Sequence, residues 1–339
     1  MKLLITESEH FSSKAIADLQ QHFEVQIENI QTREELLLKS AACEVIFIRL
    51  GFNIDQEVIQ NAKNLKYILT ATTGLDHIDV AYFESQGGQV ISLKNEVDFL
   101  GTIPSTAEHT WGLLLALLRK IPAAFDHVKQ GEWNRNNFKG NNLKGKKIGI
   151  LGLGRVGKQV ANFAEAFGME IGFFDTVSIA SNYKHHTTAA DLFQWADIIS
   201  IHIPLTPENV GFVNKTLFKN SKPLFVINTS RGAVWDENDM ASLLKEGKLL
   251  GLATDVITNE LESANWTDNP LIALANQHYN VIVTPHIAGA TFESMAMTEE
   301  FITQKFLQQH KKKKKKTYDG KLELLDREKL LSQRTSRSR

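Results

Sequence analysis

Three glycines at the spacing G-x-G-x-x-G constrain the fold of this chain more than any other feature. Gly152, Gly154 and Gly157 follow a short apolar run, 148–151, which predicts a buried strand, and apolar side chains at helical spacing come after them. A strand, a glycine turn and a helix form the context in which proteins bind a dinucleotide. The turn lets the backbone approach the pyrophosphate, and the helix N-terminus offers it unpaired N–H groups.

An acidic residue at the end of the next predicted strand extends this motif. Asp175 comes 23 residues after Gly152, close to the spacing at which a carboxylate accepts hydrogen bonds from the ribose hydroxyls. The carboxylate repels a 2′-phosphate, and the residues 176–178 include no arginine to hold one. We therefore predict NAD as the cofactor in preference to NADP. The alternative is a strand-end aspartate that only caps a turn.

Length and composition predict a two-domain protein without membrane segments. The chain has 339 residues, of which 42% are hydrophobic, enough for two cores. Its first residues turn acidic too early for a secretory signal peptide, and no apolar run approaches the roughly 18 residues of a membrane span. We therefore expect a cytoplasmic protein. Cys43 is the single cysteine, which excludes an intramolecular disulfide and favours a buried, inert thiol. We expect no metal.

Charge is unevenly distributed along the chain. The formal net charge is −1, but residues 311–339 hold twelve Lys or Arg and four acids, so the rest is acidic. Six consecutive lysines repel one another and cannot pack, which predicts a mobile basic tail. Such a charge run usually marks a solvated segment, so we expect neither a nucleic acid nor a membrane as partner. An anchor for nucleic acid or anionic lipid is the alternative.

Short apolar runs alternate with helical patterns, which is typical of parallel sheets with crossover helices. In the first hundred residues, strands are predicted at 2–6, 23–27, 45–48, 66–70 and 89–93, and helices at 13–22, 33–40, 56–63 and 78–85. A helix that is apolar nearly all round, as a buried helix is, follows at 105–120 and ends at Pro122. Further strands are predicted at 147–151, 170–174, 197–201, 224–228, 250–254 and 281–283, before a last helix at 288–309.

This pattern predicts two α/β domains. One is a doubly wound Rossmann NAD-binding domain, 105–287, because six strands with intervening helices match a complete dinucleotide domain. The other is a separate α/β domain made of 1–104 and 288–310, into which the first is inserted; the resemblance described below implies that it binds the substrate. The first hundred residues contain no glycine motif of the dinucleotide type, so this domain has another task.

Three residues at the ends of predicted strands are suited to catalysis, since open α/β sheets bind ligands at the carboxyl ends of their strands. Arg231 can bind a carboxylate and polarise a carbonyl. Glu260 can orient a histidine, and His286 belongs to the residue type that titrates nearest neutral pH. A Glu–His pair favours the imidazolium and fixes one tautomer, as a general acid for carbonyl reduction requires. Taken singly, each residue can equally be structural.

The order of these motifs resembles the D-isomer-specific 2-hydroxyacid dehydrogenase family, over about residues 42–301. The resemblance rests on four segments: the glycine motif with Asp175, Asn228-Thr229-Ser230-Arg231-Gly232, Asp255 to Glu260, and Thr284-Pro285-His286. It implies a phosphoglycerate dehydrogenase-like enzyme that interconverts a D-2-hydroxy acid and its 2-keto acid with NAD. It also implies a flavodoxin-like substrate domain and a homodimer.

The resemblance implies a role for each site residue. The catalytic triad is Arg231, Glu260 and His286, with Asp255 against the nicotinamide. The other cofactor-binding residues implied are Gly152, Gly154, Arg155, Val156, Gly157, Asp175, His202, Pro204 and Thr229. The substrate carboxylate is held by the loop 72–79, through backbone N–H groups near Gly74, and the substrate-binding residues implied are Thr73, Gly74, Asn95 and Arg231.

The chain departs from the family pattern in ways that leave the substrate open. Leu261 follows Glu260 where proline is usual, and the loop 93–99 lacks the common proline-glycine pair. In that loop Lys94, Asn95 and Glu96 are candidates for a polar substrate pocket. An alternative function is that of an NAD-sensing binding protein, like the C-terminal-binding-protein corepressors, which share this architecture and a similar triad.

Overall fold

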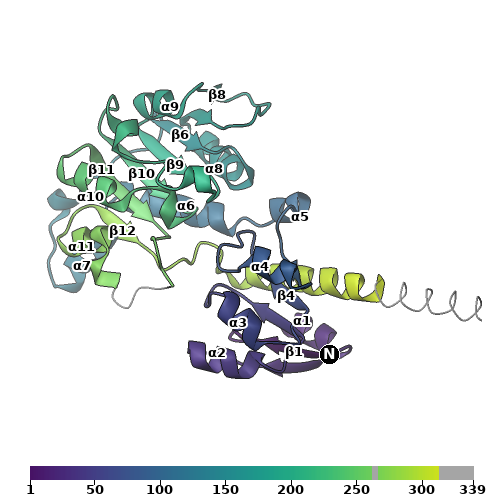
Figure 1. Cartoon of the computed structure of the whole chain (residues 1–339). Helices are drawn as coiled ribbons and strands as arrows, with labels where there is room; N and C mark the ends of the chain where they lie inside the picture. Colours follow the sequence, from purple (N-terminus) through teal and green to yellow (C-terminus); the bar gives the residue numbers. More distant parts are fainter. Residues whose placement is uncertain (262–265, 313–339) are drawn as a thin grey trace, which may run out of the picture. The chain divides into compact units, whose positions relative to one another are not determined.

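The computed structural model describes residues 1–261 and 266–312, which form two compact units (Figure 1). The first unit comprises Met1–Asn95 and the segment from Met295 onward, and the second is Glu96–Ser294. The second unit is therefore inserted into the first, as the predicted fold class requires. The segment 96–104 belongs to the second unit because Arg155 and Gln159 donate hydrogen bonds to its carbonyl oxygens. The predicted limits of the NAD-binding and substrate-binding domains, at 104/105 and 287/288, describe which residues serve which function, and they stay predictions.

The first unit is built on a five-stranded parallel sheet in the order β2-β1-β3-β4-β5, a flavodoxin-like arrangement. Its strands are β1 (Lys2–Ile5), β2 (Glu24–Ile27), β3 (Val45–Ile48), β4 (Tyr67–Thr70) and β5 (Gln89–Ile91). Its helices are α1 (Ser13–Gln20), α2 (Arg33–Ser40), α3 (Gln56–Asn61) and α4 (Val80–Ser85). These elements confirm the predicted strands and helices, with ends that differ by a few residues.

A helix over 292–312 packs on the first unit and is drawn in yellow in Figure 1. Its Phe306 stacks on Phe23, with ring centroids 5.2 Å apart, and meets the ring of Tyr67 edge-on. About two turns earlier in the same helix, Glu299 is buried and accepts hydrogen bonds from Nε of Arg49 at 2.9 Å and from its Nη2 at 2.6 Å. The helix therefore adds both apolar and charged contacts to this unit.

The second unit contains a seven-stranded parallel sheet in the order β12-β11-β10-β9-β6-β7-β8. Its strands are β6 (Lys147–Leu151), β7 (Glu170–Phe174), β8 (Lys184–His185), β9 (Ile198–Ile201), β10 (Leu224–Asn228), β11 (Leu249–Thr254) and β12 (Val281–Val283). The order reverses beside β6, which is the doubly wound arrangement predicted. β8 was not predicted, because two polar residues at a sheet edge give no apolar pattern.

Helices cover both faces of this second sheet. The helices of the second unit are α5 (Val97–Gly101), α6 (Ser105–Leu118), α7 (Ile121–Lys129), α8 (Arg155–Ala166), α9 (Ala189–Trp195), α10 (Glu237–Lys245) and α11 (Pro270–Asn276). Side chains from α9, α10 and α11 form one core with Ile199 and Val226, and those from α6 and α8 form another with Ile198 and Phe225. Neighbouring strand residues thus point to opposite faces, as the period of two requires.

Two helices of the second unit were not predicted. α5 is only five residues long, and α7 begins where the sequence analysis expected α6 to end. α6 ends at Leu118, and Lys120 then adopts a left-handed conformation with φ 53°. Pro122 does not stop a helix but lies in the first turn of α7, where a missing N–H costs nothing.

Within the described ranges, no helix is long and apolar enough to cross a membrane. Cys43 is buried, as expected, and burial raises the pKa of its thiol. The predicted basic tail, apart from Lys311 and Lys312, lies outside the described residues.

We predict that Arg49→Ala destabilises the first unit by about 3–5 kcal/mol, because it leaves the carboxylate of Glu299 buried without its cation. Calorimetry on the whole chain measures the change. Arg33→Ala is the control: it breaks a half-exposed ion pair with Asp55 and should cost about 1 kcal/mol or less. Equal losses in the two variants would contradict the prediction.

Candidate active site

The glycine turn between β6 and α8 leaves no room for side chains at two positions. Gly152 has φ 91°, and a Cβ there would lie 2.9 Å from the carbonyl oxygen of His202. A Cβ on Gly157 would lie 2.2 Å from the carbonyl oxygen of Gly152, so the helix can sit on the strand only without a side chain. At Gly154, an added Cβ would meet none of the described residues within 4 Å. The turn is therefore closely packed at Gly152 and Gly157 and open at Gly154.

The open side of this turn suits an anionic group. The N-cap of α8 is Gly154, which has no side chain to accept a hydrogen bond from the first N–H groups of the helix. Those groups, and the positive end of the helix dipole, are therefore available to a phosphate. Asp175 lies beside the turn: Oδ2 accepts from the N–H of Leu153 at 2.9 Å, and Oδ1 from that of Val177 at 3.1 Å. Each of these two oxygens has a further lone pair, which can accept a hydrogen bond from a ribose hydroxyl.

Other predicted cofactor residues surround this turn. Arg155 donates from Nη1 to the carbonyls of Leu100 and Ile103, each at 3.4 Å, and Val156 packs on the core formed by α6 and α8. His202 lies 2.8 Å from the hydroxyl of Ser200. Burial, together with the charge of Arg155, lowers the pKa of His202 to about 3, so this imidazole is neutral at physiological pH. Pro204 is exposed in the segment after β9.

The turn after β10 presents Arg231 and is organised by a buried asparagine. Oδ1 of Asn228 accepts from the N–H of Ser230 at 2.9 Å and from its hydroxyl at 2.8 Å, while Nδ2 donates to the carbonyl of Arg231 at 3.0 Å. The guanidinium of Arg231 donates to the carbonyl of Ser230 at 2.8 Å. Thr229 shares a hydroxyl contact of 2.7 Å with Thr110 of α6. The sequence analysis gave Asn228 no role of its own.

The structure brings Glu260 and His286 into hydrogen-bond contact, Oε1 with Nδ1. Both side chains are partly buried. A carboxylate accepts at Nδ1, which leaves Nε2 of the imidazole to exchange a proton with a ligand. The backbone of His286 is left-handed, with φ 54°, a conformation that a residue other than glycine keeps only when its surroundings hold it.

Asp255 holds the segment that carries His286. Its carboxylate is 1% exposed and accepts from the hydroxyl of Thr284 at 2.6 Å and from the N–H groups of Ile287 and Ala288 at 2.9 and 2.7 Å. Its backbone carbonyl accepts from the N–H of His286 at 2.8 Å. The side chain and the backbone carbonyl of Asp255 therefore both fix this turn. The contact of Asp255 with a nicotinamide stays a prediction.

A histidine that the sequence analysis passed over completes this network. Nε2 of His109, in α6, lies 3.0 Å from the hydroxyl of Thr284 and 3.3 Å from Oδ1 of Asp255. The one hydroxyl proton of Thr284 goes to Asp255, so Nε2 is the donor. Burial alone would raise the pKa of Asp255, but the hydrogen bonds from His109, Thr284 and two backbone N–H groups lower it below its usual range. The sequence analysis could not single it out, because its partners Asp255 and Thr284 are distant in the sequence.

The predicted substrate residues Thr73, Gly74 and Asn95 all belong to the first unit. The loop that follows β4 is shaped by Thr72, whose hydroxyl donates to the carbonyl of Gly74 at 2.8 Å. Thr73 is exposed, and so is Asn95, which has a left-handed backbone with φ 70°. Their contact with a substrate stays a prediction.

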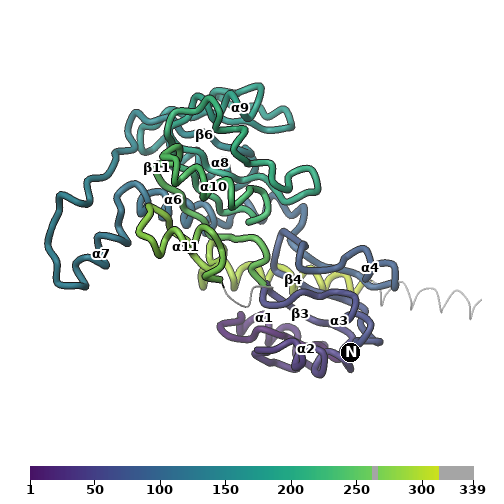
Figure 2. Tube along the Cα trace, turned by 60° about the vertical axis from the view of Figure 1, so that its left-hand side comes forward, coloured from purple at the N-terminus to yellow at the C-terminus, as the bar shows by residue number. Residues whose placement is uncertain are grey.

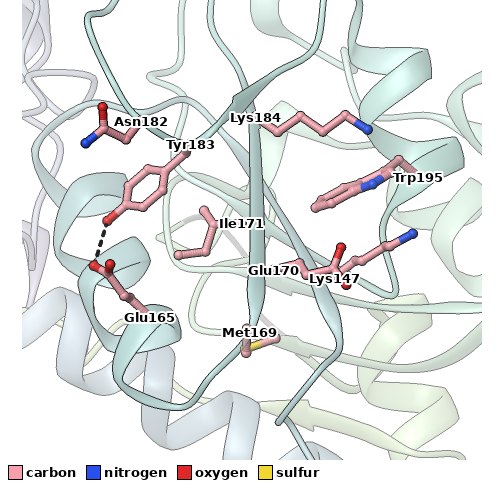
Figure 3. Close-up of a pocket in the computed structure, with 9 residues that line it drawn as sticks. All are labelled: Lys147, Glu165, Met169, Glu170, Ile171, Asn182, Tyr183, Lys184 and Trp195. Atoms are coloured by element: carbon pink, nitrogen blue, oxygen red, sulfur yellow. Dashed lines mark hydrogen bonds between the residues drawn. The ribbon is translucent and has the colours of Figure 1, made fainter.

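A separate hollow of about 570 Å³ lies at the opposite edge of the second sheet, where β6, β7 and β8 begin (Figure 3). The ammonium groups of Lys147 and Lys184 lie 5.5 and 5.1 Å from the ring centre of Trp195. Dinucleotides bind at the carboxyl ends of doubly wound strands, so this hollow is distinct from the glycine turn. Its lining residues are Lys147, Glu165, Met169, Glu170, Ile171, Asn182, Tyr183, Lys184 and Trp195.

We predict that Asp255→Asn weakens the second unit, because an amide places a donor against the donors of the turn, at about 1–3 kcal/mol for each group left unpaired. The folded pKa of Asp255 is lowered, so its stabilisation is complete above the ordinary value of 3.8 and is lost as the pH falls through the folded value.

Urea unfolding followed by tryptophan fluorescence checks this, because all five tryptophans lie in the second unit. The difference in the free energy of unfolding between the wild type and Asp255→Asn should have its maximum value at pH 7 and 5 and should decrease below pH 3.8. A difference that does not change with pH would refute the role assigned to Asp255. Asp126→Asn, at an exposed site in α7, is the control.

Comparison with known proteins identifies the family. Residues 111–288 match the family model described as D-isomer specific 2-hydroxyacid dehydrogenase, NAD binding domain. Over 302 residues, the chain is 36% identical to a D-3-phosphoglycerate dehydrogenase of Archaeoglobus fulgidus and 37% identical to one of Methanocaldococcus jannaschii. Each alignment covers 87% of this chain and 54% of the relative, so the chain spans about half the length of these relatives.

Solved structures agree with this family. The D-lactate dehydrogenase of Aquifex aeolicus, in complex with NAD and lactic acid, is 25% identical, with a TM-score of 0.77 over 92% of this chain and 96% of that one. The family model alone spans more than half of the chain, and the glycine turn it covers is built for a dinucleotide. The protein therefore belongs to the D-isomer specific 2-hydroxyacid dehydrogenase family, and its second unit contains the NAD-binding domain of that family.

Proposed function

We propose that the protein is an NAD-dependent D-2-hydroxyacid dehydrogenase, an oxidoreductase that interconverts a D-2-hydroxy acid and its 2-keto acid. The hydrogen bond between Glu260 and His286 carries this proposal. It supplies an acid–base group of fixed orientation on a domain whose family binds NAD. The D-lactate dehydrogenase and D-3-phosphoglycerate dehydrogenases similar to this chain are named for reactions of this class.

The residues around the glycine turn fit NAD. The first N–H groups of α8 and the open space beside Gly154 suit the pyrophosphate, and the carboxylate of Asp175 suits the ribose hydroxyls and disfavours a 2′-phosphate. We assign the backbone of Arg155, Val156 and Gly157 to the same contact. His202, Pro204, Thr229 and Asp255 are the further residues proposed to border the cofactor. When bound, NAD supplies or takes up the hydride of the reaction.

Three side chains carry the remaining chemistry. Arg231 binds the substrate carboxylate and polarises the carbonyl at C2. During reduction, Nε2 of His286 gives its proton to the carbonyl oxygen as negative charge develops there, and during oxidation it takes the proton from the hydroxyl. Glu260, bonded at Nδ1, keeps the imidazole in one orientation, with Nε2 directed to the substrate. The histidine then exchanges a proton with solvent before the next turnover.

We propose a small, polar 2-hydroxy acid as substrate. The names of the relatives include a phosphorylated acid and lactate, both small. Thr73, Gly74 and Asn95 are proposed to bind the substrate together with Arg231. Lys94, exposed beside Asn95, offers a cation for an anionic substituent. This gives phosphorylated keto acids a place in the assay panel alongside pyruvate, glyoxylate and hydroxypyruvate.

We also propose a homodimer. α7 has no buried residue, and its apolar side chains Ile121, Phe125 and Val128 are spaced to share one face. Trp133, just beyond the helix, is 88% exposed. Figure 2 shows α7 at the outer edge of the second unit. An exposed apolar face of this kind marks an interaction surface, and a second copy of the chain, implied by the family resemblance, is the occupant we assign.

We predict that His286→Gln and Arg231→Ala each lower the turnover of 2-keto acids with NADH by ~10²–10⁴-fold, the range that a positioned acid contributes. NADH binding, measured by protein fluorescence, should be unchanged, because neither side chain holds the glycine turn. His22→Gln, at an exposed site of the first unit, is the control for histidine loss.

The assay follows absorbance at 340 nm over the panel of keto acids. A rate close to that of the wild type in either variant would refute the catalytic role assigned to that residue. If the wild type binds NADH and oxidises it with none of the acids, the enzyme proposal fails and the NAD-sensing alternative gains support.

We predict that Phe125→Glu converts the dimer to a monomer, since it buries a charge in the proposed apolar interface. Light scattering coupled to size-exclusion chromatography measures the mass. Leu38→Glu, at an exposed site of α2, should leave the mass unchanged. A wild-type monomer, or a dimer in the Phe125 variant, would rule this interface out.

A further inference from the structure

The loop that carries Glu260 lies directly against the turn that carries Arg231. A Cβ on Gly232 would lie 2.1 Å from the carbonyl carbon of Ile257 and 2.4 Å from the nitrogen of Thr258. The two backbone segments therefore touch, and a side chain at Gly232 would push the loop away. The position of Glu260 is thus set partly by what holds residues 255–260, the segment called here the Glu260 loop.

Glu237, in the first turn of α10, holds this loop. Its Oε1 accepts from the N–H of Thr258 at 2.8 Å, and its Oε2 accepts from Nδ2 of Asn269 at 2.7 Å. The side chain is half-buried, and burial raises the pKa of Glu237 despite these bonds. An acid in this place costs free energy of desolvation, and it is not needed to cap α10, because Asp236 already does so.

Two neighbouring features make both oxygens of Glu237 necessary. Oδ1 of Asn269 accepts from the N–H groups of Leu271 and Ile272 at the start of α11, so its amide cannot turn round and Nδ2 must face Glu237. Between Thr258 and Glu260 lies Asn259, in a left-handed conformation with φ 56°. Fixing the N–H of Thr258 therefore fixes the direction in which the chain enters Glu260.

We propose that Glu237 is a positioning residue, which anchors the Glu260 loop so that Glu260 meets Nδ1 of His286. The proposal rests on the proposed function for its kinetic consequence, because a displaced Glu260 matters only if His286 transfers a proton. Its structural half, that Glu237 holds the loop, stands independently of the reaction.

The variant Glu237→Gln tests the proposal, because an amide accepts from Thr258 but sets a donor against Nδ2 of Asn269. We expect kcat to fall by about 10- to 100-fold, the scale of a misplaced catalytic group, while the dissociation constant of NADH stays unchanged. Glu246→Gln, an exposed acid at the other end of α10, removes the same charge and should change nothing.

A double-mutant cycle separates positioning from general damage. If Glu237 acts through Glu260, the variant Glu237→Gln/Glu260→Gln loses no more activity than Glu260→Gln alone, because the group being positioned is already gone. Losses that multiply would overturn the proposal. So would a Glu237→Gln variant with the kcat of the wild type.

Hydrogen–deuterium exchange provides a readout that needs no substrate. In the free protein, the peptide over 254–261 should exchange about tenfold faster in Glu237→Ala than in the wild type or in Glu246→Ala, since the N–H of Thr258 has then lost its acceptor. Unchanged exchange would refute the anchoring. If the wild type reduces no keto acid, the proposed function fails, whereas the exchange result still decides whether Glu237 holds the loop.

Discussion

One buried carboxylate fixes the part of the molecule on which the proposed chemistry depends. Asp255 accepts hydrogen bonds from the hydroxyl of Thr284 and from the backbone of residues 287 and 288, and its carbonyl accepts from the N–H of His286. A charge stays buried only where hydrogen bonds replace its water. The left-handed turn at His286 is therefore held from the end of β11, a neighbouring strand, and through His109 it is also tied to α6.

Close backbone contact at the carboxyl edge of the second sheet is the other recurring constraint. Gly157 lies against the carbonyl of Gly152, and Gly232 lies against the carbonyl of Ile257. The loops after parallel strands emerge at one edge and compete for the same space. Without side chains, these glycines let the loops stack, which leaves the space above the sheet for ligands. Glu237 and Asn228 then fix the loops by bonding backbone groups that stacking leaves unpaired.

The strands could be predicted almost completely because buried parallel strands are short, continuous apolar runs. The elements that escaped prediction lack that signal. α7 turns its apolar face outward and has a proline in its first turn, and β8 consists of Lys184 and His185 at an edge. In the site, the glycine turn and the candidate catalytic residues could be predicted from the sequence, since both depend on spacing within short segments. His109, Glu237 and Asn269 were not, because their partners are distant in the sequence.

The sequence by itself determined the doubly wound sheet, the dinucleotide turn with Asp175, and the chemical types of Arg231, Glu260 and His286, because each is written in local pattern and spacing. Only the tertiary structure decided how these groups are held. Glu237 has the sequence signature of an ordinary acid in a first helical turn, and Asn269 that of an N-cap. Their contact exists only because parallel strands bring loops that are tens of residues apart to one edge of the sheet, where unpaired backbone groups require partners.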